Sequence, residues 1–307
     1  MRAGRLKAGR LKAGRFLRRF ARHRLAVASA LLLLVLAVAA AAAPWVESWL
    51  GVEATGISLL DRFGPPSALH PLGTDELGRD VLVRLLYGGR VSLFVGVAAA
   101  LASAVIGTGI GLLAGYFGGR LDDLLMRVTD GLIALPLLPL LIVLGAIDLT
   151  RLGIPPEVAG AEDASLLRIV VLVALFGWTT VARLVRGATL SARRRDYVRA
   201  AVAMGAGSRR IMLAHILPNV AAPAVVATTL TVGNVILLES VLSFLGLGIQ
   251  PPLPSWGNML TNAQELVGTA PLLAVWPGLL IFLTVIAVNL LGDGLQDALD
   301  PRVVGKR

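Results

Sequence analysis

The chain has no cysteine, few aromatic residues and few charged residues for its length. Without cysteine it forms no disulfide, offers no thiolate nucleophile and has no cysteine-ligated metal site. Aromatic residues make up only 5% of the 307 residues, although the net charge is +10. A nucleic-acid-binding surface usually places aromatic side chains among its basic ones, so we expect no nucleic-acid partner.

Three catalytic motifs are also missing. The phosphate-binding sequence Gly-x-x-x-x-Gly-Lys-Ser/Thr does not occur, because Gly305 and Lys306 are followed by Arg307. Neither a nucleophile elbow nor a His-Glu-x-x-His metalloprotease helix is present. We therefore expect no enzyme activity, no catalytic residue, no metal site and no cofactor in this chain by itself.

Apolar residues, in contrast, make up 56% of the chain. A run of about 20 apolar residues is long enough to cross a bilayer as a helix. The pattern predicts an all-α membrane protein with six transmembrane helices, surrounded by the lipid bilayer. The predicted spans are residues 25–43, 91–117, 121–147, 166–185, 220–245 and 272–291.

The first and third spans have additional features. The first is longer than the apolar core of a signal peptide, so we expect an uncleaved helix. A signal peptide cleaved within residues 39–43 is the alternative. In the third span, Pro136 and Pro139 predict a kink, because proline removes a backbone hydrogen-bond donor.

The positive charges predict the orientation. Most of the 29 Lys and Arg residues fall outside the spans, in segments that this topology assigns to one side. Because Lys and Arg concentrate in cytoplasmic loops, we expect both termini in the cytoplasm. The predicted organisation is a basic cytoplasmic arm (1–24), the first transmembrane helix (25–43), an extracytoplasmic segment (44–89), a core of five transmembrane helices (90–293) with a cytoplasmic loop at 191–218, and a cytoplasmic tail (294–307). The arm either lies on anionic lipid head groups or is a solvated tail.

The cytoplasmic loop contains a polar, arginine-rich stretch, residues 196–219. Its alanine-rich part, 197–204, predicts a short helix, which Gly205 and Gly207 should end. A second short helix is expected at 208–217, and Pro218 marks the start of a new element.

Five residues of this loop stand at a fixed spacing: Ala200, Ala201, Gly205, Leu217 and Pro218. At this spacing they resemble the coupling loop in the membrane subunits of ABC importers, which reads Glu-Ala-Ala, three residues, Gly, nine residues, Ile, one residue, Leu-Pro. The chain departs from that loop at Arg199, in the place of the Glu, and at His215, in the place of the Ile. The resemblance implies a coupling helix that docks on an ATPase subunit, and the residues expected to take part are Arg199, Ala200, Ala201, Met204, Gly205, Ala206 and Gly207.

Three other stretches are HPLGTDELGRDVLVRLLYGGRVSL from His70, GLGIQPPLPSWGNML from Gly246 and NLLGDGLQDALDPR from Asn289. They resemble the dipeptide, oligopeptide and nickel permeases, in particular the second, C-type permease of peptide importers. The resemblance implies the type I ABC importer permease fold in a bacterial or archaeal inner membrane. It also implies four kinds of partner or ligand elsewhere in the complex: a second homologous permease, two ABC ATPase subunits or one fused pair, the ATP and Mg that they bind, and an extracytoplasmic substrate-binding protein.

Two expectations concern the extracytoplasmic side. Asp75, Glu76 and Asp80 suggest a metal site, but we favour a solvated helix start with Thr74 as N-cap. Residues 255–267 are expected to form a short interfacial helix with Trp256 at head-group depth.

Glu239 is the one acid deep within a predicted span, where a carboxylate must face a cavity or a partner. We consider two roles for it: a place on the substrate path, with Ser243 on the same helix face and Asn234 nearby, or a hydrogen-bonded structural residue at a subunit interface. Helix packing is the role expected of the small-residue face formed by Gly107, Gly111 and Gly115.

The sequence therefore predicts the permease subunit of an ATP-driven peptide importer, without catalytic residues of its own. A nickel or other small-solute importer of the same family is the first alternative. A secondary transporter driven by an ion gradient is the alternative from another class, although the chain has only one buried acid to support it.

Overall fold

The computed structural model of the chain describes residues 19–159 and 161–299. Helices dominate this part of the chain, and its only β contact is an isolated bridge between Thr74 and Asp80. The helices are α2 (Arg24–Ala41), α3 (Ala43–Leu50), α4 (Val81–Phe117), α5 (Gly119–Ala134), α6 (Leu137–Gly145), α7 (Pro156–Ala159), α8 (Glu162–Arg193), α9 (Asp196–Ala203), α10 (Ser208–Arg210), α11 (Leu217–Phe244), α12 (Ala263–Leu266) and α13 (Leu272–Leu299). Shorter turns are η1 (Leu59–Asp61), η2 (Leu149–Leu152), the π-helical η3 (Ile211–Ile216) and η4 (Asn258–Leu260).

Five of the described helices are long and apolar enough to cross a membrane. They are α2, α4, α8, α13 and the continuous helix from Ser208 to Phe244. The pair α5 and α6 makes a sixth span if it is taken as one element, and it is bent by 82°. The all-α class agrees with the sequence, and the number of spans agrees with the six predicted when α5 and α6 count as one span.

The bend between α5 and α6 lies where proline predicts a kink. α5 ends at Ala134, and Pro136, with φ −66° and ψ 103°, is the N-cap residue of α6. Proline supplies no backbone N–H, so the ladder of helical hydrogen bonds stops there. The third span is thus two helices rather than one kinked helix.

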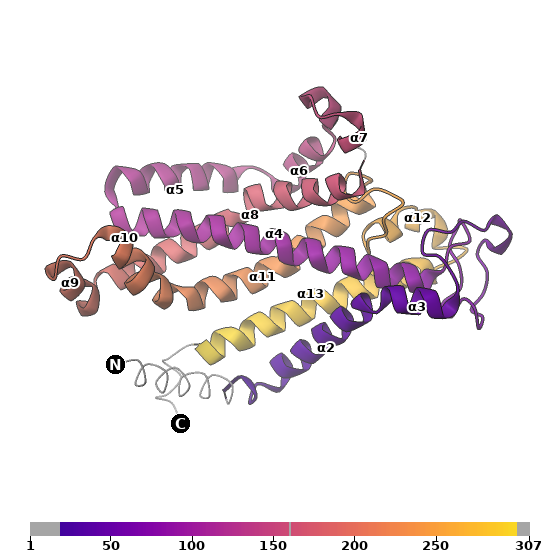
Figure 1. Cartoon of the computed structure of the whole chain (residues 1–307), viewed down its shortest axis with the longest axis horizontal. Helices are drawn as coiled ribbons and strands as arrows, with labels where there is room; N and C mark the ends of the chain where they lie inside the picture. The colour runs from indigo at the N-terminus through magenta and orange to yellow at the C-terminus, as the bar shows by residue number, and fades with distance from the viewer. Residues whose placement is uncertain (1–18, 160, 300–307) are drawn as a thin grey trace.

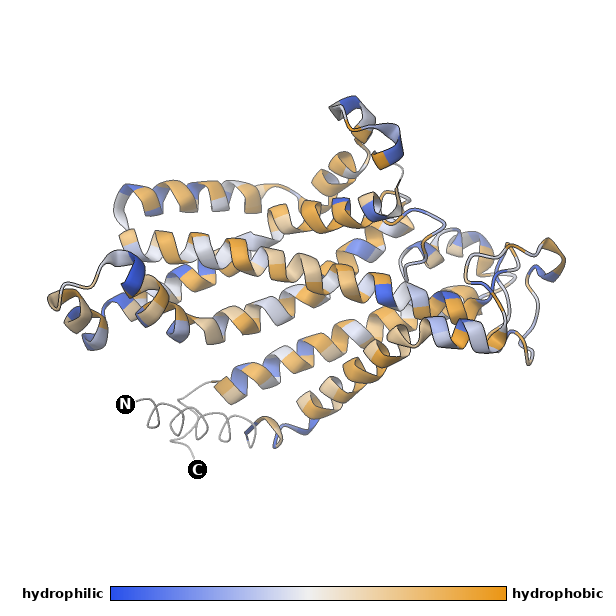
Figure 2. Ribbon diagram, viewed as in Figure 1, coloured by the Kyte–Doolittle hydropathy of each residue, from blue (hydrophilic) through white to orange (hydrophobic). Residues whose placement is uncertain are grey.

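The long helices run side by side, with the connections gathered at two ends (Figure 1). At one end lie the start of α2, the α4–α5 turn, α9 with α10, and the end of α13; we call this the inner end. At the other, the outer end, lie α3, α12 and the segment that precedes α4. Figure 2 shows apolar residues along the long helices and hydrophilic ones in the connections at both ends. The basic arm, up to residue 18, and the tail from residue 300 lie outside the described residues.

α4 starts earlier than the apolar run suggests. It begins at Val81 rather than Val91, because Asp80 caps it: the Asp80 carboxylate accepts a hydrogen bond from the backbone N–H of Val83 at 2.7 Å. Thr74 is therefore not the N-cap. The resulting helix has 37 residues and extends beyond the apolar run at the outer end.

The centre of the bundle is the contact between α4 and α8. Gly107, Gly111 and Gly115 share one face of α4 and lie against the α8 backbone. A Cβ atom on Gly107 would lie 2.5 Å from the Trp178 carbonyl oxygen, and one on Gly111 would lie 2.6 Å from that of Ala182. Only glycine allows the two backbones to come this close.

Candidate functional site

At the inner end, α9 forms a short helix between α8 and α11. Asp196 lies in its first turn, where a negative charge is favourable for the helix dipole. After Met204 the chain turns at Gly205, which has φ +78°. The Gly205 N–H donates to the Val202 carbonyl at 2.9 Å and the Ala206 N–H to the Ala201 carbonyl at 3.0 Å. This pair of bonds is the Schellman arrangement, which ends a helix with glycine in the left-handed conformation.

One face of α9 is buried against the bundle and the other is exposed. Val198 and Ala201 are each 2% exposed. Val198 belongs to an apolar cluster with Ile211 and residues of α8 and α11, and Ala206 packs against the same cluster. Five of the seven expected coupling residues are exposed: Arg199, Ala200, Met204, Gly205 and Gly207. α9 is thus a helix held by its inner face, with a free outer face that carries Met204 at 80% exposure.

A concave, basic surface lies beside α9. A hollow of about 520 Å³ opens between α9 and the inner ends of α4 and α8, and Tyr116, Arg193 and Arg199 are among its lining residues. The Arg193 guanidinium lies over the Tyr116 ring, 5.9 Å from the ring centroid.

α10, η3 and α11 form one continuous helix, which corrects the prediction of a separate helix at 208–217. The π-helical turn η3 lies directly before Pro218, and the Leu217 N–H donates to the Met212 carbonyl, five residues earlier. The Asn219 side-chain amide donates to the His215 carbonyl at 2.7 Å. The wider turn lets the helix continue past Pro218, which supplies no backbone N–H, without a break.

The second candidate region is a buried polar cluster around Glu239, which is fully buried. The Ser243 hydroxyl donates to Oε1 of Glu239 at 2.7 Å, and the Ser92 hydroxyl donates to Oε2 at 3.0 Å. Ser92 lies on α4, so the cluster connects α4 with α11. Of the three residues predicted for the substrate path, the structure brings Glu239 and Ser243 together, whereas Asn234 is exposed on another face of α11.

The Glu239 cluster also holds the outer segment that follows α11. The Ser243 hydroxyl accepts a hydrogen bond from the Ile249 N–H at 3.0 Å, and the Ser92 hydroxyl accepts one from the Trp256 N–H at 3.2 Å. Gly257 packs against Ser240, where an added Cβ would lie 2.6 Å from the Ser240 Cα. Residues 246–257 are therefore fastened to both helices by the serines that bind the carboxylate.

Trp256 corrects a sequence-based expectation. Its ring packs inside the protein instead of facing lipid head groups, because it is only 2% exposed and its indole N–H donates to the Leu85 carbonyl at 2.9 Å. Its ring fills the space left by Gly88 and Gly89 of α4. The predicted interfacial helix at 255–267 is replaced by the short elements η4 and α12.

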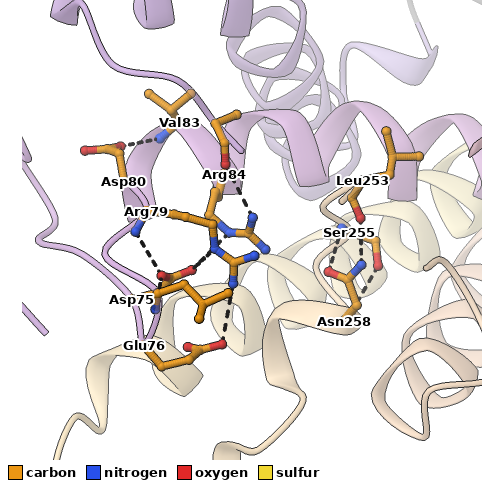
Figure 3. Close-up of polar contacts among 11 residues, drawn as sticks. Asp75, Glu76, Arg79, Asp80, Val83, Arg84, Leu253, Ser255 and Asn258 are labelled. Atoms are coloured by element: carbon orange, nitrogen blue, oxygen red, sulfur yellow. Dashed lines mark hydrogen bonds and ion pairs between the residues drawn. The ribbon is translucent and has the colours of Figure 1, made fainter. Parts of the chain in front are cut away.

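The acids ahead of α4 form a buried ion-pair cluster rather than a solvated helix start (Figure 3). The Asp75 carboxylate is 9% exposed and accepts a hydrogen bond from the Arg79 Nε at 2.7 Å, and it lies 3.3 Å from the Arg84 Nε. It also accepts backbone bonds from Leu77 and Arg79 at 2.9 and 3.0 Å. His70 Nδ1 lies 3.0 Å from Asp80. No group of acids and histidines within the described ranges is arranged to hold a metal ion.

Two ion pairs between α5 and α8 were not anticipated from the sequence. Arg186 binds Asp122 with both Nε and Nη2, at 2.5 and 2.6 Å, and Arg183 binds Asp130 at 2.5 Å. A signal was available, because the charges of α5 recur at helical spacing within a predicted span.

Two family models match the chain. The first, described as "Binding-protein-dependent transport system inner membrane component", matches residues 107–305. The second, described as "N-terminal TM domain of oligopeptide transport permease C", matches residues 13–50.

Several curated proteins are similar over almost the whole chain. The glutathione transport system permease protein GsiD of Pectobacterium atrosepticum is 42% identical over 94% of this chain and 90% of its own. The di/tripeptide transport system permease protein DppC of Pseudomonas aeruginosa is 40% identical over 94% of this chain and 91% of its own. The oligopeptide transport system permease protein OppC of Haemophilus influenzae is 38% identical over 93% of this chain and 87% of its own.

Proposed function

Because the chain belongs to the binding-protein-dependent transport system inner membrane components, a family of multi-pass inner-membrane permeases, we propose that it is a permease subunit of an ATP-driven importer of short peptides. In this proposal the chain forms half of the translocation path and a second homologous permease forms the other half. Two ABC ATPase subunits bind ATP and Mg, and an extracytoplasmic binding protein delivers the solute. The chain itself has no catalytic role.

The substrate class rests on the names of the relatives. Two of them are named for oligopeptides and for di- and tripeptides, and the third for glutathione, which is itself a short peptide. These names favour a dipeptide or oligopeptide over nickel, the first alternative. Growth on a dipeptide as sole nitrogen source, compared with metal-limited urease activity, separates the two substrates. A deletion strain that loses only the metal-dependent activity would contradict the peptide assignment.

The coupling role rests on the outer face of α9. Helix α9 is anchored by its buried Val198 and Ala201, so a force on its outer face is transmitted to α8 and α11 through the shared apolar cluster. The outer face has small or flexible side chains at Ala200 and Met204, which allow close approach of another protein. We propose that this face docks on the ATPase subunit.

Cross-linking tests the docking. The chain has no native cysteine, so a single Met204→Cys variant places one thiol on it. In the assembled complex we expect this thiol to cross-link to a cysteine in the surface groove of the ATPase subunit, with a yield that changes on ATP binding. Leu60→Cys, which is 99% exposed at the outer end, is the control and should form no such cross-link. Equal yields from both positions would refute the docking.

ATP depletion tests the energy source. We expect uptake to stop when ATP is removed while the ion gradient is maintained. Uptake that continues under these conditions would favour the gradient-driven alternative.

A further inference from the structure

Helix α3 carries two tryptophans on its outside. Trp45 and Trp49 are 76% and 83% exposed, and their spacing of four residues places them on one helix face. Glu47 lies on the opposite face, where its Oε1 accepts a hydrogen bond from the Ala54 N–H at 2.8 Å and its Oε2 accepts one from the Tyr87 hydroxyl of α4. These two bonds set the rotation of α3, so that the tryptophan face remains uncovered by the rest of the described chain.

α3 follows the span α2 almost without a break. One residue, Ala42, separates the two helices, and its φ of −75° and ψ of −5° are those of a right-handed helix. The Ala42 N–H donates to the Val38 carbonyl at 2.9 Å, and the Val46 N–H donates to the Ala42 carbonyl at 3.0 Å. Figure 1 shows α3 at the outer end of α2. The position of α2 across the membrane therefore determines the position of α3.

The depth of the two tryptophans follows from the length of an uncharged segment. Residues 25–46 contain no charged side chain, with Arg24 before them and Glu47 after them. At about 1.5 Å per residue, Trp45 lies about 32 Å along the helix from Arg24, close to the ~30 Å thickness of the hydrocarbon core. The uncharged segment is hardly longer than a span requires, so its position across the membrane is fixed to within a few residues. Trp45 and Trp49 then lie at the boundary between hydrocarbon and head groups.

The small residues of α2 face the rest of the chain. Ala26 packs directly against Gly294 of α13, and Ala40 packs against Gly89 of α4. Ser29, on the same side, is only 5% exposed. Membrane helices approach one another through small residues, so the packing face of α2 is the one already used within this chain.

The opposite side of α2 and α3 carries large apolar residues. Leu31, Val38 and Trp45 recur at intervals of seven residues, which keeps them on one face, and all three are exposed. A partner helix fits this face poorly, because packing faces in membranes are rich in small residues. Water fits it poorly as well, because the face is apolar along its length. Acyl chains fit the part on α2, and lipid head groups fit the tryptophans, whose rings combine an apolar body with an N–H donor.

We propose that α3 is a lipid anchor, in which Trp45 and Trp49 lie among the head groups at the outer end of the bundle. The partner is the phospholipid bilayer, so the anchor does not depend on which solute the complex imports. Because Glu47 binds both Tyr87 of α4 and the Ala54 N–H, the anchor also holds the start of the outer segment at the membrane surface.

Depth-resolved fluorescence quenching tests the anchor. The complex is placed in phosphatidylcholine bilayers with bromine either near the head-group end or near the methyl end of the acyl chains. The fluorescence difference between the unaltered complex and a Trp45→Phe, Trp49→Phe double variant isolates the two tryptophans. We expect shallow bromine to quench this difference at least about twofold more strongly than deep bromine. Trp178→Phe is the matched control, because Trp178 is only 7% exposed and its fluorescence should be quenched by neither lipid.

Three other quenching results would overturn the anchor. Stronger quenching by deep bromine would place the two rings in the hydrocarbon core. Quenching by dissolved iodide, but by neither lipid, would place them in water. Quenching by none of the three would place them against another protein chain.

Thiol labelling in phosphatidylcholine bilayer discs tests whether the two rings hold α3 in place. The chain has no native cysteine, so Ser48→Cys places a single thiol at an exposed position of α3. Thiols react as thiolates, which form less readily in apolar surroundings. Replacement of both Trp45 and Trp49 by alanine should therefore raise the rate of labelling by a charged reagent about threefold or more. Replacement of both by tyrosine should keep the rate low, because tyrosine also prefers the interface.

Leu60→Cys is the control for the labelling. It is 99% exposed at the outer end and should react at the same rate with tryptophan, alanine or tyrosine at the two positions. An unchanged rate at Ser48→Cys in the alanine variant would overturn the anchoring role of the two rings.

Discussion

Glu239 on α11 and Ser92 on α4, 147 positions apart in the chain, are joined by a hydrogen bond of 3.0 Å in which the serine hydroxyl donates to the carboxyl oxygen. The same hydroxyl accepts a bond from the backbone N–H of Trp256 in the outer segment. One carboxyl group thereby connects two long helices and the loop that covers them. Its complete burial within this single chain favours the structural role over the path role that the sequence leaves open.

Substitution of Glu239 by leucine should destabilise the complex. The hydroxyls of Ser92 and Ser243 would lose their acceptor in a buried site, at a cost of about 1–3 kcal/mol for each unsatisfied group. Glu239→Gln keeps one carbonyl acceptor and nearly the same volume, so its Tm should fall less. Thermal unfolding of the purified complex measures both effects. Asn234→Leu, at an exposed position of the same helix, is the control and should leave Tm nearly unchanged.

The same Glu239 variants separate its two roles. A structural role predicts that uptake falls only as the fraction of folded complex falls. A path role predicts a normal Tm for Glu239→Gln with an altered KM for uptake. The second result would contradict the structural role.

The six spans were predictable because a membrane requires about 20 consecutive apolar residues, a property that a short stretch of sequence displays. The bend at Pro136 was predictable for a similar reason, because proline acts on its own helix. The turn at Gly205 was also local, since its φ of +78° is one that glycine adopts readily.

The predictions that the structure corrects concern residues whose surroundings are formed by distant parts of the chain. Asp75 looks solvated in the sequence, but Arg84 of α4 lies next to it and the main chain folds over it. Trp256 looks interfacial, but Gly88 and Gly89, more than 160 positions earlier, leave the space that buries its ring. These contacts leave no periodic pattern within either segment, so they could not be predicted from the sequence of that segment.

The conformation of Gly205 is expected to be essential for coupling. Its left-handed backbone costs a residue with a Cβ about 1–2 kcal/mol, although no atom lies within 4 Å of the added Cβ. Gly205→Val should therefore change the position of α9 rather than clash with a neighbour. We expect more ATP hydrolysed per solute imported, or loss of the ATPase from the purified complex.

Gly187→Ala provides the matched control for Gly205. Gly187 also has free space around it, but it lies within α8, outside the expected coupling residues, and its helical backbone is one that alanine adopts without strain. Its ratio of ATP hydrolysed to solute imported should match that of the unaltered complex. Equal effects of the two substitutions would show that backbone strain is not the cause.

Removal of the Asp75 charge should loosen the segment ahead of α4. Asp75→Asn weakens the interactions with Arg79 and Arg84 and leaves two buried guanidinium groups poorly neutralised. We expect faster proteolysis of residues 58–80 from the outer side. Glu76→Gln is the control, because its carboxylate is 31% exposed and makes a contact of only 3.5 Å with Arg79. Similar proteolysis rates for both variants would exclude Asp75 as the centre of the cluster.

The approach of α4 to α8 predicts opposite results for two glycines separated by one residue. A Cβ at Gly111 would lie 2.6 Å from the Ala182 carbonyl oxygen and 2.8 Å from the Val185 Cβ, so the helices must move apart. Overpacking of this kind costs about 1–3 kcal/mol, and Gly111→Ala should lower the Tm of the complex. Gly109 faces open space, so Gly109→Ala should leave Tm unchanged or raise it slightly through the higher helix propensity of alanine. Thermal unfolding of the complex with each variant measures the two Tm values. An equal loss of Tm at Gly109 would mean that the α4 backbone itself, rather than its contact with α8, requires glycine.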